Sequence, residues 1–164
     1  MQGPLLKYVV GLVVFTLLAV TAWPYIYVYR LDNALSSADL NSLAPLIDMD
    51  AVRTQVKADI EKDVDKTVGD GGGRVMSWLK KGVKVVSDTA GDVNVDLQWV
   101  KETLNAKPGD SDSRRDSFMG DIDYAFYESL DTFIIRLGAL DAEPVHVRLA
   151  RSDQTWRVIA IFGR

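Results

Sequence analysis

The feature that most restricts this sequence is an uncharged stretch close to its N-terminus. No residue from Tyr8 to Tyr29 carries a charged side chain. A helix from Leu5 to Trp23 would be about 28 Å long at 1.5 Å per residue, close to the hydrocarbon thickness of a bilayer. The sequence therefore predicts one transmembrane helix and places the protein at a membrane.

A cleaved signal peptide is the alternative to a retained anchor. Lys7 would supply its basic region, and Val20-Thr21-Ala22 has the small residues of a cleavage site. Cleavage there would leave Trp23 and Pro24 at the new terminus, and the apolar stretch continues beyond them without a polar break. We therefore favour a retained anchor, while removal of the segment and release of a secreted domain stays open.

Aromatic residues mark the predicted exit from the membrane. Tryptophan and tyrosine favour the boundary, where the ring lies among headgroups and its N–H or O–H reaches water. We predict membrane-interface contacts, including the flanking basic residues, for Lys7, Trp23, Tyr25, Tyr27, Tyr29 and Arg30. The short N-terminal tail is typical of a signal anchor, so we expect a single-pass protein of the bacterial inner membrane with its soluble domain on the periplasmic side.

The composition of the soluble part excludes some functions. Beyond residue 29 it carries 18 of the 19 basic and all 23 acidic side chains, a net charge of −5. Nucleic-acid binding requires clustered positive charge, so no nucleic-acid partner is expected. The chain has no cysteine, which excludes disulfides and thiolate metal sites.

Periodicity divides the chain into an anchor and one soluble domain. We assign residues 1–29 to the anchor, 30–105 to a helical part, 106–117 to a linker, and 118–164 to an antiparallel meander. The hydrophobic period is helical up to residue 105 and becomes two after residue 117. The predicted fold class is α+β, with a transmembrane helix followed by helices on a four-stranded antiparallel sheet.

One face of the predicted sheet would be rich in aromatic residues. If the strands alternate regularly, a concave surface would be lined by Phe118, Ile122, Tyr124, Phe126, Trp156 and Phe162. Such a surface either encloses a small apolar ligand or is covered by helices as core. We favour the packed core and keep the pocket as the alternative.

Three segments carry a resemblance to a known family: WPYIYVYRLDNAL, SADLNSLAPLIDMDAVR and the closing hairpin that ends in TWRVIAIF. Together they resemble an uncharacterised family of small, membrane-anchored bacterial proteins known only as a domain of unknown function. Residues 23–66 and 118–162 carry this resemblance. It implies a helix-plus-curved-sheet body, like the cone of cystatin-like or nuclear-transport-factor-like folds. It brings no known reaction and no catalytic residues.

A segment with tryptophan among basic residues is a candidate contact surface. Its residues are Arg74, Trp78, Lys80, Lys81 and Lys84, on a predicted amphipathic helix. Helices of this kind lie on bilayer surfaces or dock on partners. The alternative, which we favour, is that Trp78 enters the core and the lysines stay in water.

The remaining polar motifs have simpler explanations than catalysis. His146 is the only histidine, and alternation places it opposite the core. Asp48 and Asp50 stand where carboxylates cap a helix, and Asp121 and Asp123 lack a third oxygen ligand. We therefore expect no catalytic residue, metal or cofactor.

These observations favour a non-catalytic, membrane-anchored accessory or interaction protein, with membrane lipid and a membrane protein as expected partners. The alternative is a small-ligand-binding domain or a hydrolase-like enzyme that uses the concave sheet face.

Overall fold

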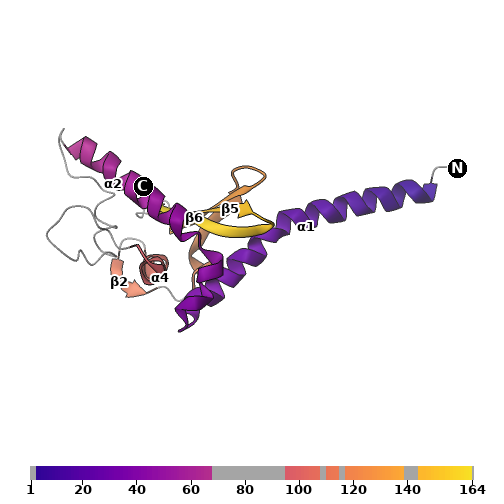
Figure 1. Cartoon of the computed structure of the whole chain (residues 1–164). Coiled ribbons are helices and arrows are strands. Elements are labelled where there is room, and N and C mark those ends of the chain that lie inside the picture. The colour runs from indigo at the N-terminus through magenta and orange to yellow at the C-terminus, as the bar shows by residue number, and fades with distance from the viewer. Residues whose placement is uncertain (1–2, 68–94, 108–109, 115–116, 139–143, 164) are drawn as a thin grey trace.

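The computed structural model describes residues 3–67, 95–107, 110–114, 117–138 and 144–163. It combines helices with antiparallel sheets, so the predicted α+β class is confirmed (Figure 1). The helices are α1 (Gly3–Ser36), α2 (Met49–Thr67) and α4 (Leu97–Asn105), with short 3-10 turns at Leu40–Ser42, Ala44–Leu46 and Met119–Asp121. The strands are β1 (Ala106–Lys107), β2 (Asp110–Arg114), β3 (Ile122–Tyr127), β4 (Thr132–Leu137), β5 (Val145–Ser152) and β6 (Thr155–Gly163).

Helix α1 has two halves with opposite surroundings. Its first half projects freely from the body (Figure 1), and large apolar side chains there are exposed, such as Leu12 at 67% and Leu17 at 62%. Its second half is central to the core, where Val28 is 2% and Leu31 0% exposed. A single unbroken helix therefore serves as both the free apolar segment and a core element of the soluble domain.

The polar groups of the free half are satisfied within the helix. The hydroxyl of Thr16 donates to the carbonyl of Leu12 at 2.9 Å, and that of Thr21 to the carbonyl of Leu17 at 2.8 Å. Such bonds to the preceding turn remove the cost of an unpaired hydroxyl in an apolar surrounding. This half is therefore compatible with lipid. Among the described residues, α1 is the one helix long and apolar enough to cross a membrane.

Short polar contacts fix the C-terminal end of α1. The last carbonyls of a helix lack intrahelical partners. Lys101 of α4 donates to the carbonyl of Ser37, and the Asn105 amide donates to the carbonyl of Leu35 at 3.3 Å. Helix α4 therefore holds the end of α1 in a fixed position.

Aspartates cap the N-terminal ends of α2 and α4. Asp48 accepts from the backbone N–H of Ala51 at 3.0 Å before α2, and Asp96 from that of Trp99 at 2.8 Å before α4. The backbone N–H of Asp48 also donates to the carbonyl of Val158 at 2.9 Å, which ties the start of α2 to strand β6. The capping explanation of Asp48 is therefore confirmed.

The four-stranded sheet has the order β3-β4-β5-β6, with every neighbouring pair antiparallel. One face packs on α1, α2 and α4 through side chains that are completely buried. These include Phe133, Ile135, Leu137, Val147, Leu149 and Val158, all at 0% exposure. Strands β5 and β6 join through Asp153 and Gln154, whose φ values of 49° and 63° are those of a tight hairpin turn.

Two β-bulges break the alternation that the sequence suggested. On β3, Ile122 pairs with Leu137 but Tyr124 pairs with Arg136, which leaves Asp123 as the extra residue. On β6, Val158 pairs with Leu149 and Ala160 with Arg148, which leaves Ile159 as the extra residue. Because an extra residue reverses the face of everything beyond it, strict alternation along these strands was a wrong expectation.

Residues 106–117 differ from the predicted linker. They contain β1 and β2, which pair antiparallel as a small two-stranded sheet. In the sequence a Pro-Gly pair, Pro108 and Gly109, stands between the two strands. Polar composition suggested a linker, but polar residues also form short antiparallel strands such as these.

The dual role of α1 gives a first prediction. Leu31→Ala removes a fully buried side chain from the core and should lower the free energy of unfolding of the soluble domain by about 2–5 kcal/mol. Leu17→Ala, on the exposed half, is the matched control and should change it by less than about 0.5 kcal/mol. Denaturant unfolding in micelles, followed by tryptophan fluorescence, measures both. Equal effects would contradict the division of α1 into two halves.

Candidate functional site

The junction between α1 and the sheet begins at a proline. Pro24 lies inside α1 and has no backbone N–H, so the carbonyl of Val20 lacks its helical donor. The phenol of Tyr127, at the end of β3, donates to this carbonyl at 2.7 Å. Desolvation raises the pKa of Tyr127 above its ordinary value of 10.0.

A second tyrosine reinforces the junction from the helix side. The hydroxyl of Tyr25 donates to the carbonyl of Ala125 at 3.0 Å, and its ring meets Phe133 edge-on at 5.2 Å. Tyr127 also contacts Phe133 edge-on, at 5.3 Å. The helix and strand β3 are therefore joined by reciprocal tyrosine hydrogen bonds and an aromatic cluster at residues 20–25 of α1.

Two hairpin turns lie around α1 where it leaves the body (Figure 1). The turn of residues 128–131 is placed there by the bond of Tyr127 to Val20. It carries Leu130, the most exposed large apolar side chain described, at 87%. The turn of residues 152–155 lies at the same end, because Gln154 and Thr155 share a groove with Trp23. We call these two turns the hairpin base.

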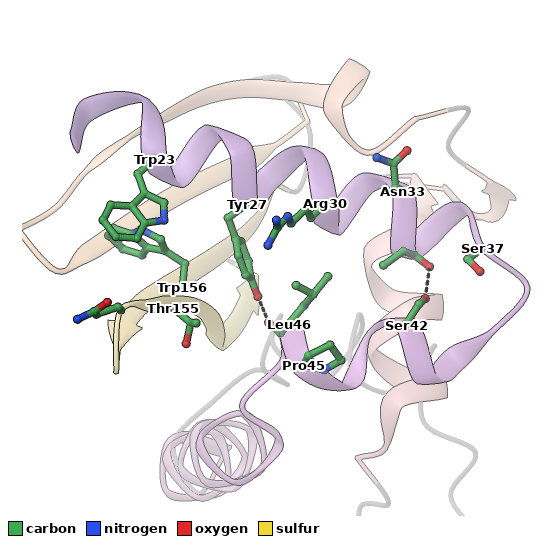
Figure 2. A pocket seen from close by; sticks show the side chains of 12 residues that line it. Trp23, Tyr27, Arg30, Asn33, Ser37, Ser42, Pro45, Leu46, Thr155 and Trp156 are labelled. Atoms are coloured by element: carbon green, nitrogen blue, oxygen red, sulfur yellow. Dashed lines mark hydrogen bonds between the residues drawn. The ribbon is translucent and has the colours of Figure 1, made fainter. Parts of the chain in front are cut away.

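A groove runs along α1 from this base (Figure 2). It has a volume of about 550 Å³ and lies between one face of α1, the 3-10 turns and the β5–β6 turn. Its apolar wall comprises Trp23, Tyr27, Ala34, Pro45, Leu46 and Trp156. Its polar lining comprises Arg30, Asn33, Ser37, Ser42, Gln154 and Thr155. We call this cavity the α1 groove.

Arg30 is the one charged side chain of this lining. Figure 2 shows it extending from α1 toward Tyr27, whose hydroxyl donates to the carbonyl of Leu46. The nearest acidic residue in sequence, Asp32, is engaged elsewhere: its carboxylate accepts from Ser117 Oγ and from the N–H of Met119, both at 3.2 Å. No ion pair or hydrogen bond of Arg30 occurs among the described residues.

The structure divides the predicted membrane-interface set into three groups. Lys7, Trp23, Tyr29 and Arg30 are exposed, with Trp23 at 40% and Tyr29 at 57%. Tyr25 is also exposed, at 46%, but its hydroxyl is bonded to β3. Tyr27 is 7% exposed and belongs to the core. A tyrosine, with an apolar ring and a polar hydroxyl, suits both a membrane boundary and the edge of a core. For Tyr27, the tertiary packing places it in the core.

The six residues predicted to line a pocket do not share one surface. Phe118 and Trp156 are buried in the core at 2%, and Ile122 packs against it. Tyr124, Phe126 and Phe162 lie on the opposite face, because their cross-strand partners Arg136, Ile134 and His146 are on that face. The two bulges explain this division.

The opposite face of the sheet holds a layer of cations and aromatic rings that the sequence did not suggest. His146 stacks on Phe162 at 5.3 Å, and the Arg148 guanidinium lies 5.2 Å from the same ring. Arg148 also forms a two-pronged ion pair with Glu128, at 2.7 and 2.8 Å. The Arg136 guanidinium lies 5.6 Å from the ring of Tyr124. As predicted, His146 is opposite the core, but it is 8% exposed rather than solvated.

The candidate contact segment with Arg74, Trp78, Lys80, Lys81 and Lys84 lies outside the described residues, so its role stays a prediction. Within the described ranges, no three histidine or acidic side chains come close enough together to hold a metal ion. Asp123 instead contacts Arg136 at 3.8 Å.

The sequence model of one protein family matches residues 13–104, more than half of the chain. That family is described as "Protein of unknown function (DUF2939)". The chain belongs to this family. The predicted resemblance to an uncharacterised family is therefore confirmed, and the match covers most of α1, all of α2 and nearly all of α4. No curated protein and no solved structure matches the chain.

The proline junction of this DUF2939 protein gives a second prediction. Tyr127→Phe removes the donor to the Val20 carbonyl and leaves it unpaired beside the apolar helix, which should cost about 1–3 kcal/mol of stability. Tyr29→Phe, an exposed tyrosine without such a bond, is the control and should be nearly neutral. Thermal unfolding in micelles compares the two. Equal melting temperatures would remove the junction as a stabilising feature.

Proposed function

We propose that this protein is a non-catalytic, membrane-anchored interaction protein whose soluble domain stands directly on the bilayer outside the cytoplasm. The observation that carries the proposal is the continuity of α1. Its exposed half is apolar and its buried half belongs to the core, with Leu12 at 67% and Leu31 at 0% exposure. A flexible linker would let a domain move away from the membrane, whereas this helix holds it in one position.

The free length of α1 supports a domain that touches the bilayer. Residues 3–19 precede the junction at Val20, and as a helix they are about 26 Å long. The hydrocarbon layer is about 30 Å thick, so the hairpin base would be drawn to the level of the headgroups. At that level the exposed side chain of Leu130 would enter the interface, where burial of apolar surface is favourable.

The packing of the sheet favours an interaction role over a ligand-binding or enzymatic one. A cone-fold binder or hydrolase would need space on the helix-covered face of the sheet. On that face, side chains of the central strands such as Ile135 and Val147 are completely buried against the helices. The opposite face, where Phe126 is 49% exposed, and the α1 groove with Arg30 are instead open to a membrane protein partner.

The anchoring can be tested directly because the chain has no cysteine. Asn41→Cys introduces one thiol at an exposed position of the soluble domain. We expect the intact chain to stay with membranes after alkaline carbonate extraction. We also expect a membrane-impermeant maleimide to label this thiol in spheroplasts as completely as after lysis.

Two results would contradict the proposal. A mature chain that begins near residue 23 and dissolves without detergent would show that α1 is cleaved. Labelling that requires lysis would place the domain on the cytoplasmic side.

Contact of the hairpin base with lipid gives a further prediction. An environment-sensitive fluorophore on Leu130→Cys should shift to the blue in nanodiscs and be quenched by lipids spin-labelled near the headgroup. The same fluorophore on Asn41→Cys should show neither effect, because residue 41 follows the C-terminal end of α1, which lies about 24 Å from Val20 along the helix axis. Equal responses at both positions would contradict a domain that stands on the bilayer through its hairpin base.

A further inference from the structure

We infer that the α1 groove binds the phosphate headgroup of an anionic membrane lipid, with Arg30 as its main ligand. The inference rests on the proposed membrane anchoring. It assigns the groove one occupant, a lipid from the leaflet in which the hairpin base stands. Three features of the groove support this: its level relative to the bilayer, its charge, and its combination of a polar lining with an apolar wall.

The first feature is the depth of the groove relative to the bilayer. Trp23 lies at its membrane end and is 40% exposed, as expected for a ring at the boundary of the hydrocarbon layer. Arg30 is attached about 10 Å farther along the helix. Side chains on a helix lean toward its N-terminus, and Figure 2 shows Arg30 leaning toward Tyr27. The guanidinium is thereby brought back toward the level of the headgroup phosphates.

The second feature is the charge of the lining. Arg30 is its one charged group, and no carboxylate of the described residues lines the groove beside it. Arginine presents a planar set of donors that matches the oxygens of a phosphate in a two-pronged contact. The amides of Asn33 and Gln154 also line the groove and donate no hydrogen bond within the described part of the chain. These groups together suit an anion with several oxygen acceptors.

The third feature is the combination of this polar lining with an apolar wall at the membrane end. Trp23 and Trp156 both belong to this wall. A lipid has the same arrangement, with apolar chains toward the membrane and its phosphate farther out. A free phosphate ion would use Arg30 but would leave the apolar wall uncovered.

Gln154 adds a conformational argument. Its φ of 63° lies in the left-handed region, which costs a residue other than glycine about 1–2 kcal/mol. Glycine would be the ordinary residue at this point of a tight hairpin turn. A strained residue that also lines the groove is consistent with a role for its side chain there.

Lipid binding by the full chain tests the inference. The purified protein in detergent would be titrated with phosphatidylglycerol and with phosphatidylcholine, and bound lipid would be counted by native mass spectrometry. We expect preferential retention of phosphatidylglycerol, reduced about tenfold or more in Arg30→Gln because a two-pronged charged contact is lost. Arg30→Lys, which keeps the charge but not the planar donors, should lie between the two.

Arg151→Gln is the matched control. It removes the same charge from an exposed arginine of β5, next to the hairpin base, that does not line the groove. It should retain phosphatidylglycerol as the wild type does. An equal loss in both variants would show unspecific attraction and overturn the inference, as would unchanged binding by a folded Arg30→Gln variant.

A competition experiment separates the two sources of phosphate. Inorganic phosphate at the concentration of the lipid should not displace phosphatidylglycerol, whereas displacement would identify a simple anion site and overturn the lipid assignment. Failure of the inference is distinct from failure of the anchoring. A chain that stays in carbonate-washed membranes while Arg30→Gln binds lipid normally would refute the groove site alone.

Discussion

The second half of α1 is the element around which the soluble domain is built. Val28, Leu31 and Leu35 are 0–2% exposed and contribute to one core with the sheet and the other helices. Burying three such side chains contributes several kcal/mol, about 1.5–3 kcal/mol each. The domain cannot separate from this helix without losing that core. The direction of the free apolar half is therefore set by the packing of the domain.

At the proline junction, a side chain from the sheet replaces a hydrogen bond that is missing from the helix. A carbonyl left without a donor in an apolar surrounding is costly. Here the Val20 carbonyl is freed by Pro24, and a phenol from β3 supplies the missing bond. The position of the proline thus determines where the sheet attaches to the helix. In a helix without this proline, the carbonyl of residue 20 would already accept a backbone N–H, and Tyr127 would have to share it.

Sequence patterns were sufficient for the features that depend on local preferences. They include the long apolar helix, the aspartate cap of α2 and the closing hairpin of β5 and β6. The faces of β3 and β6 were not predictable in the same way. A bulge at Asp123 or Ile159 reflects how one strand fits its neighbour, and nothing in the pattern of either strand marks it.

The candidate site was harder to predict for a related reason. Arg30 and Trp23 were identified as boundary residues, but the α1 groove also needs Gln154 and Leu46, which are distant in the sequence. Tyr27 was expected in the headgroup layer and is instead a core residue bonded to Leu46. Tyr127 was not singled out because its role depends on a proline about 100 residues earlier. Tertiary contacts decided each of these positions.

Because α1 runs without interruption from the free half into the core, the orientation of the domain is coupled to that of the free half. The exposed half of α1 and the sheet turn together, so a change in tilt of one is a change in tilt of the other. One residue added to or removed from the free half would leave the core intact and rotate it by about 100° relative to the earlier part of the helix. A neighbouring membrane protein that binds the free half would in this way determine which side of the sheet faces it.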